Sequence, residues 1–574
     1  MIGVEFLYEM KRIFRNNIFR LFILFSVVGV ITMQYTWINL TMLHLPHIRL
    51  YDCWIPWSYK GLPFAMPFMN AFLFNFVQVV FVIFICSNDL CVRSRETVEA
   101  LYVRPVSNVK IVMGRNAGKL VAVTLLNFLS MGGALFFNIL YSGYAFNGSL
   151  YLFYWLTLTF PTLVFILGLS NWLGQVVKHQ GLFILLVLSI VGAGILFLAT
   201  RLEGFLDPFA REIPNVFSDI TGHAGIVNYL LQRITIFLIG IVFIFLTVGF
   251  YPRLDNSVNT RKKTGVLVGG LLLVLMIPVV TFINRHDARW EQQAFCKSLQ
   301  DRYGGVLVDH VVSQRIVLQE ETHGFHAESW MRITRLTSSD SSLVLFLNPG
   351  LEVDALEQDG IPVTYSRTGQ VLVTDLHLVE KDTVNLHVTY HGHIDGSVVC
   401  SDLPRESRGR ELSKRLGGMY RSGTRTVLDL ENYKSYSPAS LWYPTCVIPS
   451  TSFLQVKDFT CYSLTVRHRE GATVISQGIP EELKNDETIF HHAHALPGIN
   501  LCIGNYNCRT IRVDSIRYNV YYFPGHEYFF ERFGKVDDNV LVERIREIKQ
   551  DIEYHKGNLS GAVVWGGEKR DRKY

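Results

Sequence analysis

Long apolar stretches recur through the first half of the chain, and they constrain its fold more than any other feature. A helix needs roughly 20 predominantly apolar residues to cross a bilayer. Seven stretches have about this length: 21–37, 68–87, 120–141, 150–174, 181–200, 229–250 and 265–284. So many uncharged runs exceed what the core of a water-soluble domain can bury. The sequence therefore predicts a polytopic α-helical membrane domain of seven spans.

Charge is distributed unequally along the 574 residues. Residues 1–285 hold 21 Lys and Arg against 11 Asp and Glu, whereas residues 286–574 hold 33 against 38. Basic residues gather in the cytoplasmic loops of membrane proteins. With the N-terminus inside, the predicted inner segments carry 15 Lys and Arg and the outer ones five. We therefore expect a multi-pass protein of the cell (inner) membrane, with a cytoplasmic N-terminus.

This orientation has two consequences. Seven spans is an odd number, so the C-terminal half is expected in the periplasm or outside the cell. The charge division also excludes a nucleic-acid-binding protein with one continuous basic face, and no nucleic-acid partner is expected. The chain begins with a basic stretch around Lys11 and Arg12 but has no small-residue cleavage site, so no removable signal peptide is predicted.

Residues 1–20 combine apolar positions at helical spacing with Lys and Arg between them. This pattern predicts an amphipathic helix on the inner membrane surface. The alternative, that the segment extends the first span, stays open. A helical membrane domain is then expected over 21–264, with a long inner loop over 88–119 and a seventh span over 265–284.

Amide side chains are the main polar groups inside the predicted spans. No span carries the series of ionisable residues expected of a proton relay, so the energy for any transport is expected from another protein. Asn and Gln at this depth either bond neighbouring helices or line a path. The candidates for lining a path are Asn75, Gln78, Asn127, Asn138 and Asn171.

The inner loop 88–119 carries the most specific pattern. A helix is expected to end before Pro105, and Ser107 or Asn108 can cap the next one. The loop resembles that of type-2 ABC exporter permeases, in which a short helix, a Pro-Val-Ser turn and a Gly-Lys at the mouth of the next span follow one another. Here these are Pro105-Val106-Ser107 and Gly118-Lys119, and the likeness covers about 1–250. The resemblance implies a permease domain over 21–264 with six core spans, to which 265–284 would add a seventh. The Glu96-Thr97 pair departs from the family's usual Gly-Thr.

The resemblance implies a function for this loop. In that family the matching segment touches a separate cytosolic ABC ATPase, which holds the ATP and magnesium, and the permease subunits act in pairs. The implied ATPase-coupling residues are Arg93, Arg95, Glu96, Thr97, Glu99, Leu101, Tyr102, Arg104 and Pro105. The alternative is a solvated loop whose basic residues only fix the topology.

The chain itself is not expected to bind ATP or any other cofactor. Its nearest phosphate-loop candidate, 114–120, has three residues between the glycines where four are needed. Leu120 also stands where Ser or Thr would hold magnesium. ATP hydrolysis is therefore expected in a different chain.

The second half has the two-residue period of strands. Apolar residues alternate with polar ones at Val384, Leu386, Val388 and Tyr390. The same pattern predicts strands over 342–348, 351–358, 370–378, 461–467, 472–476 and 516–523. Asp359-Gly360 predicts a hairpin turn. We expect an extracytoplasmic antiparallel β-sandwich or saddle domain over 296–537, then a C-terminal helix and disordered tail over 538–574.

This half resembles the N-terminal β domain of aminopeptidase N-like zinc peptidases. The likeness rests on the LWYP run at 441–444, the strand pair at 462–478 and the IGNY run at 503–506, and covers about 305–530. ABC permeases joined to such aminopeptidase modules form a family, and the chain resembles its first half. The catalytic part is expected to be lost or to be supplied by another subunit.

No enzymatic activity is expected in this chain. Zinc peptidases of that type use H-E-x-x-H, and His526-Glu527 lacks the second His. His491, His492 and His494 are interpreted as exposed loop residues, so no metal site is predicted. Seven cysteines are expected outside, where disulfides can form, and Cys502 with Cys508 is one candidate pair.

Two functions remain as expectations. The first is the transmembrane permease subunit of an ATP-driven ABC-type exporter or related transport machine, whose β domain binds cargo or a partner. The alternative is a membrane-anchored scaffold whose β domain binds a peptidase or peptide without transport.

Overall fold

The computed structural model describes most of the chain. The described residues are 2–40, 65–93, 107–141, 147–198, 204–251 with short gaps between 211 and 224, 258–304, 307–337, 342–399, 427–448, 457–527 without 484–485 and 493, and 531–550 without 533–534. The predicted disordered tail at the end of 538–574 lies outside these ranges.

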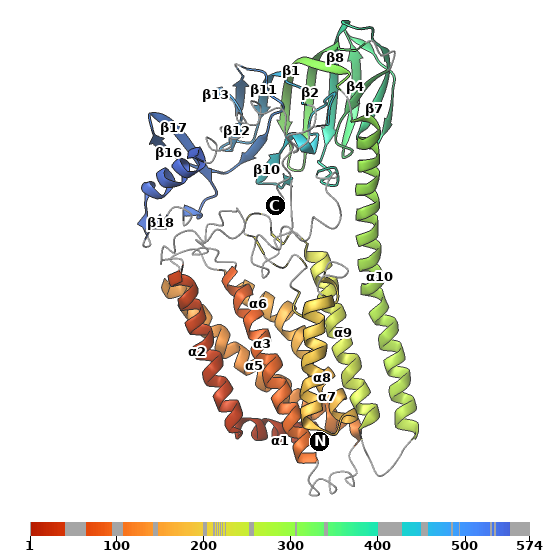
Figure 1. The fold of residues 1–574 in the computed structure, drawn as a ribbon, viewed down its shortest axis with the longest axis vertical. Helices are drawn as coiled ribbons and strands as arrows, with labels where there is room; N and C mark the ends of the chain where they lie inside the picture. The colour runs from red at the N-terminus through yellow and green to blue at the C-terminus, as the bar shows by residue number, and fades with distance from the viewer. Residues whose placement is uncertain are drawn as a thin grey trace, which may run out of the picture. The chain divides into compact units, whose positions relative to one another are not determined.

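Within the described residues, all seven predicted apolar stretches lie in helices. The helices are α1 (Ile2–Phe14), α2 (Asn17–Leu40), α3 (Ala65–Arg93), α5 (Asn108–Tyr141), α6 (Ser149–Tyr154), α7 (Phe160–Val176), α8 (Gln180–Ala193), α9 (Ile226–Phe250) and α10 (Val258–Tyr303), with π-helical segments η3 (Trp155–Thr159) and η4 (Gly194–Leu198). In Figure 1, α3, α7 and α9 run alongside one another, and α3–α7 and α7–α9 are packed pairs.

Five helical stretches are long and apolar enough to cross a membrane within the described residues. They are Pro67–Leu90, Asn108–Leu140, Ser149–Val176, Ile226–Phe250 and Arg261–Tyr303. Asn17–Gly29 and Gln180–Ala193 are shorter apolar helices. The fold thus contains a polytopic apolar helical region, and the exact number of spans stays a prediction.

Strands dominate the chain after α10 (Figure 1). They are β1 (Asp309–Glu320), β2 (Phe325–Arg335), β3 (Ser342–Phe346), β4 (Leu351–Gln358), β5 (Ile361–Pro362), β6 (Tyr365–Thr368), β7 (Val371–His377), β8 (Thr383–Gly392), β9 (Leu428–Asp429), β10 (Tyr433–Tyr436), β11 (Cys461–Arg467), β12 (Thr473–Ser476), β13 (Ile479–Leu483), β14 (Glu487–His491), β15 (Leu501–Gly504), β16 (Asn507–Val513), β17 (Ile516–Tyr522), β18 (Glu531–Arg532) and β19 (Lys535–Val536). Each strand predicted from alternation is present.

An eight-stranded sheet in the order β13-β14-β11-β1-β2-β8-β4-β5 and a four-stranded sheet in the order β12-β15-β10-β9 form the main β region. The Asp359-Gly360 turn is confirmed, because both residues have positive φ between the paired strands β4 and β5. The buried apolar side chains of both sheets form one core, which includes Leu318, Trp442 and Leu464.

The prediction of a wholly antiparallel architecture is wrong at one position. Strand β11 pairs with β1 in parallel, with Ser313 opposite Cys461. Parallel neighbours need a long crossover, and here strands β2–β10 lie between the two in the chain. Local alternation does not contain this information, because it does not show which distant strand becomes the neighbour.

Helix α10 continues without a break beyond the predicted seventh span, and its C-terminal part packs against strands of the β region. Phe282 stacks on Phe205 with ring centres 4.2 Å apart. Further along the helix, Cys296 and Leu299 lie in an apolar cluster with Phe346 of β3 and Val371 of β7. The same helix therefore contributes to two different cores.

The chain divides into two compact units, and the second contains residues Asn505–Tyr574. Within it, β16 and β17 form a hairpin and Tyr506 packs on Phe523. Lys549, in a helix over 538–550, pairs with Asp514 at 2.8 Å. The helix predicted from the spacing of Val540, Leu541 and Ile545 is therefore present.

Candidate functional site

Four helices meet at a cluster of charged and amide side chains, which we call the α1-end network: Glu9, Arg12, Asp89, Lys119 and Asn171. Lys119 of α5 is 2% exposed. Its Nζ donates to Asp89 Oδ2 of α3 at 2.6 Å and to Asn171 Oδ1 of α7 at 3.1 Å. A buried ammonium requires such partners, because an isolated charge away from water is costly.

Helix α1 completes the network from one side. Arg12 lies 2.5 Å from Asp89 Oδ1 and donates to Glu9 at 2.5 Å, so Asp89 receives two cations. Gly118 allows this contact, because a Cβ there would lie 2.8 Å from Cβ of the buried Glu9. Gly118 thus allows α1 to pack closely against α5, and Lys119 binds Asp89.

The implied ATPase-coupling residues follow directly after this network in the chain. Arg93 is the last residue of α3, four positions after Asp89. The others, Arg95, Glu96, Thr97, Glu99, Leu101, Tyr102, Arg104 and Pro105, lie outside the described residues. The network therefore stands where α3 leads into the predicted coupling segment.

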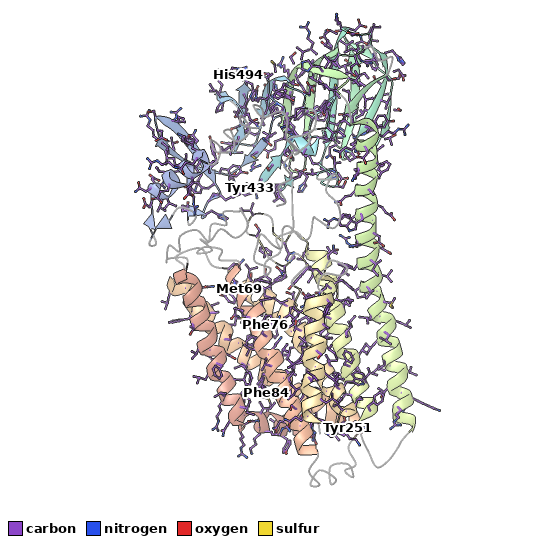
Figure 2. All side chains as sticks on the ribbon, viewed as in Figure 1. Met69, Phe76, Phe84, Tyr251, Tyr433 and His494 are labelled. Carbon is purple, nitrogen blue, oxygen red and sulfur yellow. The ribbon has the colours of Figure 1, made fainter. Side chains whose placement is uncertain are left out.

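Two candidate path-lining residues lie together in the middle of α3, next to the labelled Phe76 (Figure 2). Gln78 Nε2 donates to Asn75 Oδ1 at 2.7 Å and to the carbonyl of Thr159, in η3, at 3.1 Å. All three residues are buried, yet Asn75 Nδ2, Gln78 Oε1 and Thr159 Oγ1 have no hydrogen-bond partner in the described part of the chain. A π-helical segment beside unsatisfied polar atoms is typical of functional positions.

The structure separates the other candidates. Asn171 belongs to the α1-end network, and Asn138 donates to Tyr151. Asn127 is buried in α5, and its Nδ2 has no partner among the described residues. Of the five amides, Asn75 and Gln78 are hydrogen-bonded to each other, and a path-lining role for any of the five stays a prediction.

The burial of charged side chains among the helices was not predicted from the sequence. Besides Lys119, Arg233 is buried in α9, where it donates to the carbonyls of Asp207 and Pro208 and to Thr162 Oγ1. It fixes the segment after α8 against α7 and α9. A lone Lys or Arg at the edge of an apolar stretch, opposite an Asp at the edge of another, is the signal that could have revealed such pairs.

A cavity of about 400 Å³ lies in the β region. It is lined by Gln314 of β1, Tyr462 of β11, Tyr443, Lys457, Asp458 and Asn500. Burial raises the pKa of Tyr443 well above its ordinary value, and burial also raises the pKa of Tyr462. Both phenols are therefore protonated near neutral pH and can donate hydrogen bonds.

The histidine-rich segment contains His491, His492 and His494. His491 and His494 are exposed and His492 is half-buried. Among the described residues no three His, Cys, Asp or Glu side chains come together as a metal site. Cys502 and Cys508, a candidate disulfide, are free thiols.

No family model and no curated protein matches the sequence. Part of the chain resembles an M1 zinc metallopeptidase from Deinococcus radiodurans (TM-score 0.28, 17% identity, covering 38% of this chain and 47% of that one). Yeast LTA4 hydrolase (0.25, 12%, 35% and 30%) and Legionella pneumophila aminopeptidase A (0.28, 10%, 40% and 25%) are similar in the same partial way. The chain spans less than half the length of each, and scores this low do not establish a shared fold.

Proposed function

We propose that the chain is the transmembrane permease subunit of an ATP-driven ABC-type exporter or a related transport machine. The ATP is hydrolysed by a separate cytosolic ABC ATPase, and two permease subunits act together. The N-terminus is cytoplasmic. The β region lies on the other side of the membrane and binds cargo or a partner.

The α1-end network is the observation that supports this proposal most. A force applied to the segment after α3 is transmitted at Asp89, which binds both Arg12 and Lys119. Lys119 transmits this force to α5, and Asn171 transmits it to α7. A purely topological loop does not need a buried ion pair at its origin, whereas a coupling segment does, because motion of a loop reaches the spans only through rigid contacts.

Association with an ATPase tests the proposal directly. We would purify the full chain from its native membrane and search the eluate by mass spectrometry for a chain with a phosphate loop. Arg95→Glu and Glu99→Arg should each lower the amount recovered several-fold. The matched control is Arg261→Glu, which reverses a charge in another predicted inner segment.

The outcome separates the proposal from a structural role of the loop. Recovery that falls for Arg95→Glu and not for Arg261→Glu supports docking at this loop. Absence of any ATPase, or equal recovery from all variants, contradicts the proposal.

A membrane-anchored scaffold is the second candidate, and the cavity in the β region favours it, since a binding site can act without transport. The two candidates differ in energy use. Vesicles that contain the native complex should show nucleotide-dependent transport only if the first candidate is right.

A further inference from the structure

Helix α1 directs both of its carboxylates toward the other helices. Glu9 is 1% exposed and binds Arg12 of its own helix, and Glu5 Oε2 lies 3.9 Å from Arg115 Nε of α5. Helices α1 and α5 are a packed pair, and α1 runs crosswise to α2 in Figure 1. The side of α1 that faces away from these contacts therefore carries no acidic residue.

Positive charge is in excess on this exposed side. The contacts between the helices contain equal numbers of acidic and basic side chains: Glu5, Glu9, Asp89, Arg12, Arg115 and Lys119. Three further cations, Lys11, Arg15 and Arg20, are exposed, and within the described residues none of them takes part in an ion pair. Because the inner charges compensate one another, these three remain to attract an anionic partner.

Large apolar side chains lie exposed among these cations. Val4, Leu7 and Tyr8 are each at least 60% exposed. Val4 and Tyr8 share one helix face with Lys11 and Arg15, because the four follow the spacing i, i+4, i+7 and i+11. A soluble acidic protein or a nucleic acid neutralises the cations but leaves the apolar side chains in water. A phospholipid covers both kinds, with its headgroup and its acyl chains.

Packing fixes the corner between α1 and α2. Phe19 of α2 contacts Phe14 of α1 edge-on at 4.9 Å and Phe81 of α3 at 5.4 Å. The predicted apolar span 21–37 begins directly after Arg20. Where this span enters the bilayer, the exposed cations lie at the boundary, which is the level of the lipid phosphates.

We propose that the exposed side of α1 and the first turn of α2 bind anionic phospholipids. Lys11, Arg15 and Arg20 contact the headgroup phosphates, and Leu7 and Phe14 lie among the acyl chains. The cytoplasmic leaflet, on the predicted side of the N-terminus, is the one that holds anionic lipids. An amphipathic helix as such requires no particular headgroup, whereas a surface from which both carboxylates are withdrawn selects for negative charge.

This inference goes beyond the proposed function, because lipid binding needs neither an ATPase nor cargo. Lipid selection can be measured on the purified chain alone. Failure of one proposal is therefore distinguishable from failure of the other.

Lipid competition on the full chain in mild detergent tests the inference. We would incubate the protein with equal amounts of phosphatidylglycerol and phosphatidylcholine that carry the same acyl chains, remove unbound lipid by gel filtration and quantify both lipids by mass spectrometry. The test variant combines Lys11→Gln, Arg15→Gln and Arg20→Gln. The matched control removes three exposed cations of the β region with Arg332→Gln, Arg512→Gln and Arg517→Gln.

The unmodified chain and the control should retain phosphatidylglycerol in preference to phosphatidylcholine. Each cation near an anionic surface changes the binding constant about fivefold, so the triple variant should lower this preference at least about fivefold. Basic residues beside a first span also set its orientation. If the triple variant does not insert, the single variants Lys11→Gln and Arg15→Gln decide, and each should lower the preference about two- to fivefold.

Three results overturn the inference. The first is equal retention of the two lipids by the unmodified chain, which is expected if the exposed side of α1 binds an acidic protein instead. The second is an equal loss of preference in the test variant and the control. The third is displacement of phosphatidylglycerol by soluble glycerol 3-phosphate, which would show that the cations bind a free anion and not a lipid.

Discussion

The helical region and the β region differ in where their large apolar side chains lie. In the helices, large apolar residues lie exposed, as Leu273 does at 74%, while the charged Lys119 and Arg233 are buried. In the β region, Leu318 and Leu464 are fully buried. Exposed apolar helix faces are expected if lipid surrounds the first region, and a buried apolar core is expected if water surrounds the second.

The difference also changes what each region needs for a defined structure. Lipid offers no hydrophobic driving force between helices, so polar contacts and close packing must select the neighbours. The α1-end network does this at one end of the helices. In the β region an apolar core supplies the driving force, and buried polar contacts such as Arg335 with Asp309 add to it.

The largest expected effect comes from breaking the α1-end network. Lys119→Met leaves Asp89 with one cation and removes the donor to Asn171. Loss of one partner of a buried ion pair costs about 3–5 kcal/mol. We expect this loss of folding free energy in denaturant unfolding of the purified protein in detergent.

A second variant shows whether the buried charge is the cause. In the Lys119→Met, Asp89→Leu double variant, Arg12 still pairs with Glu9, so stability should recover in part. If the double variant is less stable than Lys119→Met, uncompensated charge at Asp89 is not the reason for the loss.

The next prediction tests which solvent, lipid or water, surrounds each of the two regions. Leu273, 74% exposed, lies near the centre of the apolar stretch of α10, and Ile479 of β13 is similarly exposed at 80%. Lys at the centre of a membrane span costs about 2.5–3.5 kcal/mol, and a Lys in water costs almost nothing. Leu273→Lys should therefore lower membrane insertion strongly, and Ile479→Lys should not. Equal insertion of both variants would mean that α10 does not face lipid.

Buried glutamines allow a finer comparison. Gln78 donates to Asn75 and Thr159, and Gln314 donates to Ser329 and Pro444, each bond within 3.1 Å. Hydrogen bonds between membrane helices contribute about 0.6 kcal/mol on average, whereas unmade bonds in a water-soluble core cost about 1–3 kcal/mol. Unfolding experiments should therefore show a smaller loss for Gln78→Leu than for Gln314→Leu, and the reverse order would contradict the assignment of solvents.

The smallest effect is a pH dependence confined to the β region. A hydrogen bond to Asp354 raises the pKa of His391. The folded state therefore holds this proton more tightly than the unfolded one. The pair adds stability below about pH 6.5, and that contribution is lost as pH rises through the raised pKa. The melting temperature of His391→Asn should differ from that of the unmodified chain at pH 5.5 and match it at pH 8.5. A pH-independent difference would assign the effect to packing.

The sequence was sufficient to predict the apolar helices and seven of the strands, because both depend on local periodicity. Leu351–Gln358 of β4 was predicted to the residue. The sequence was not sufficient to predict the α1-end network, because Asp89 and Lys119 meet only when α3 and α5 pack. The same limit applies to the parallel β1–β11 pair and to the cavity, whose walls come from segments far apart in the chain.

ATP hydrolysis by the complex purified through this chain tests the central claim most directly. The unmodified complex should hydrolyse ATP, and Arg12→Met should retain the ATPase while lowering hydrolysis several-fold, because α1 no longer binds Asp89. A purified chain that brings no ATP hydrolysis with it, in a preparation that is folded and complete, would contradict the account.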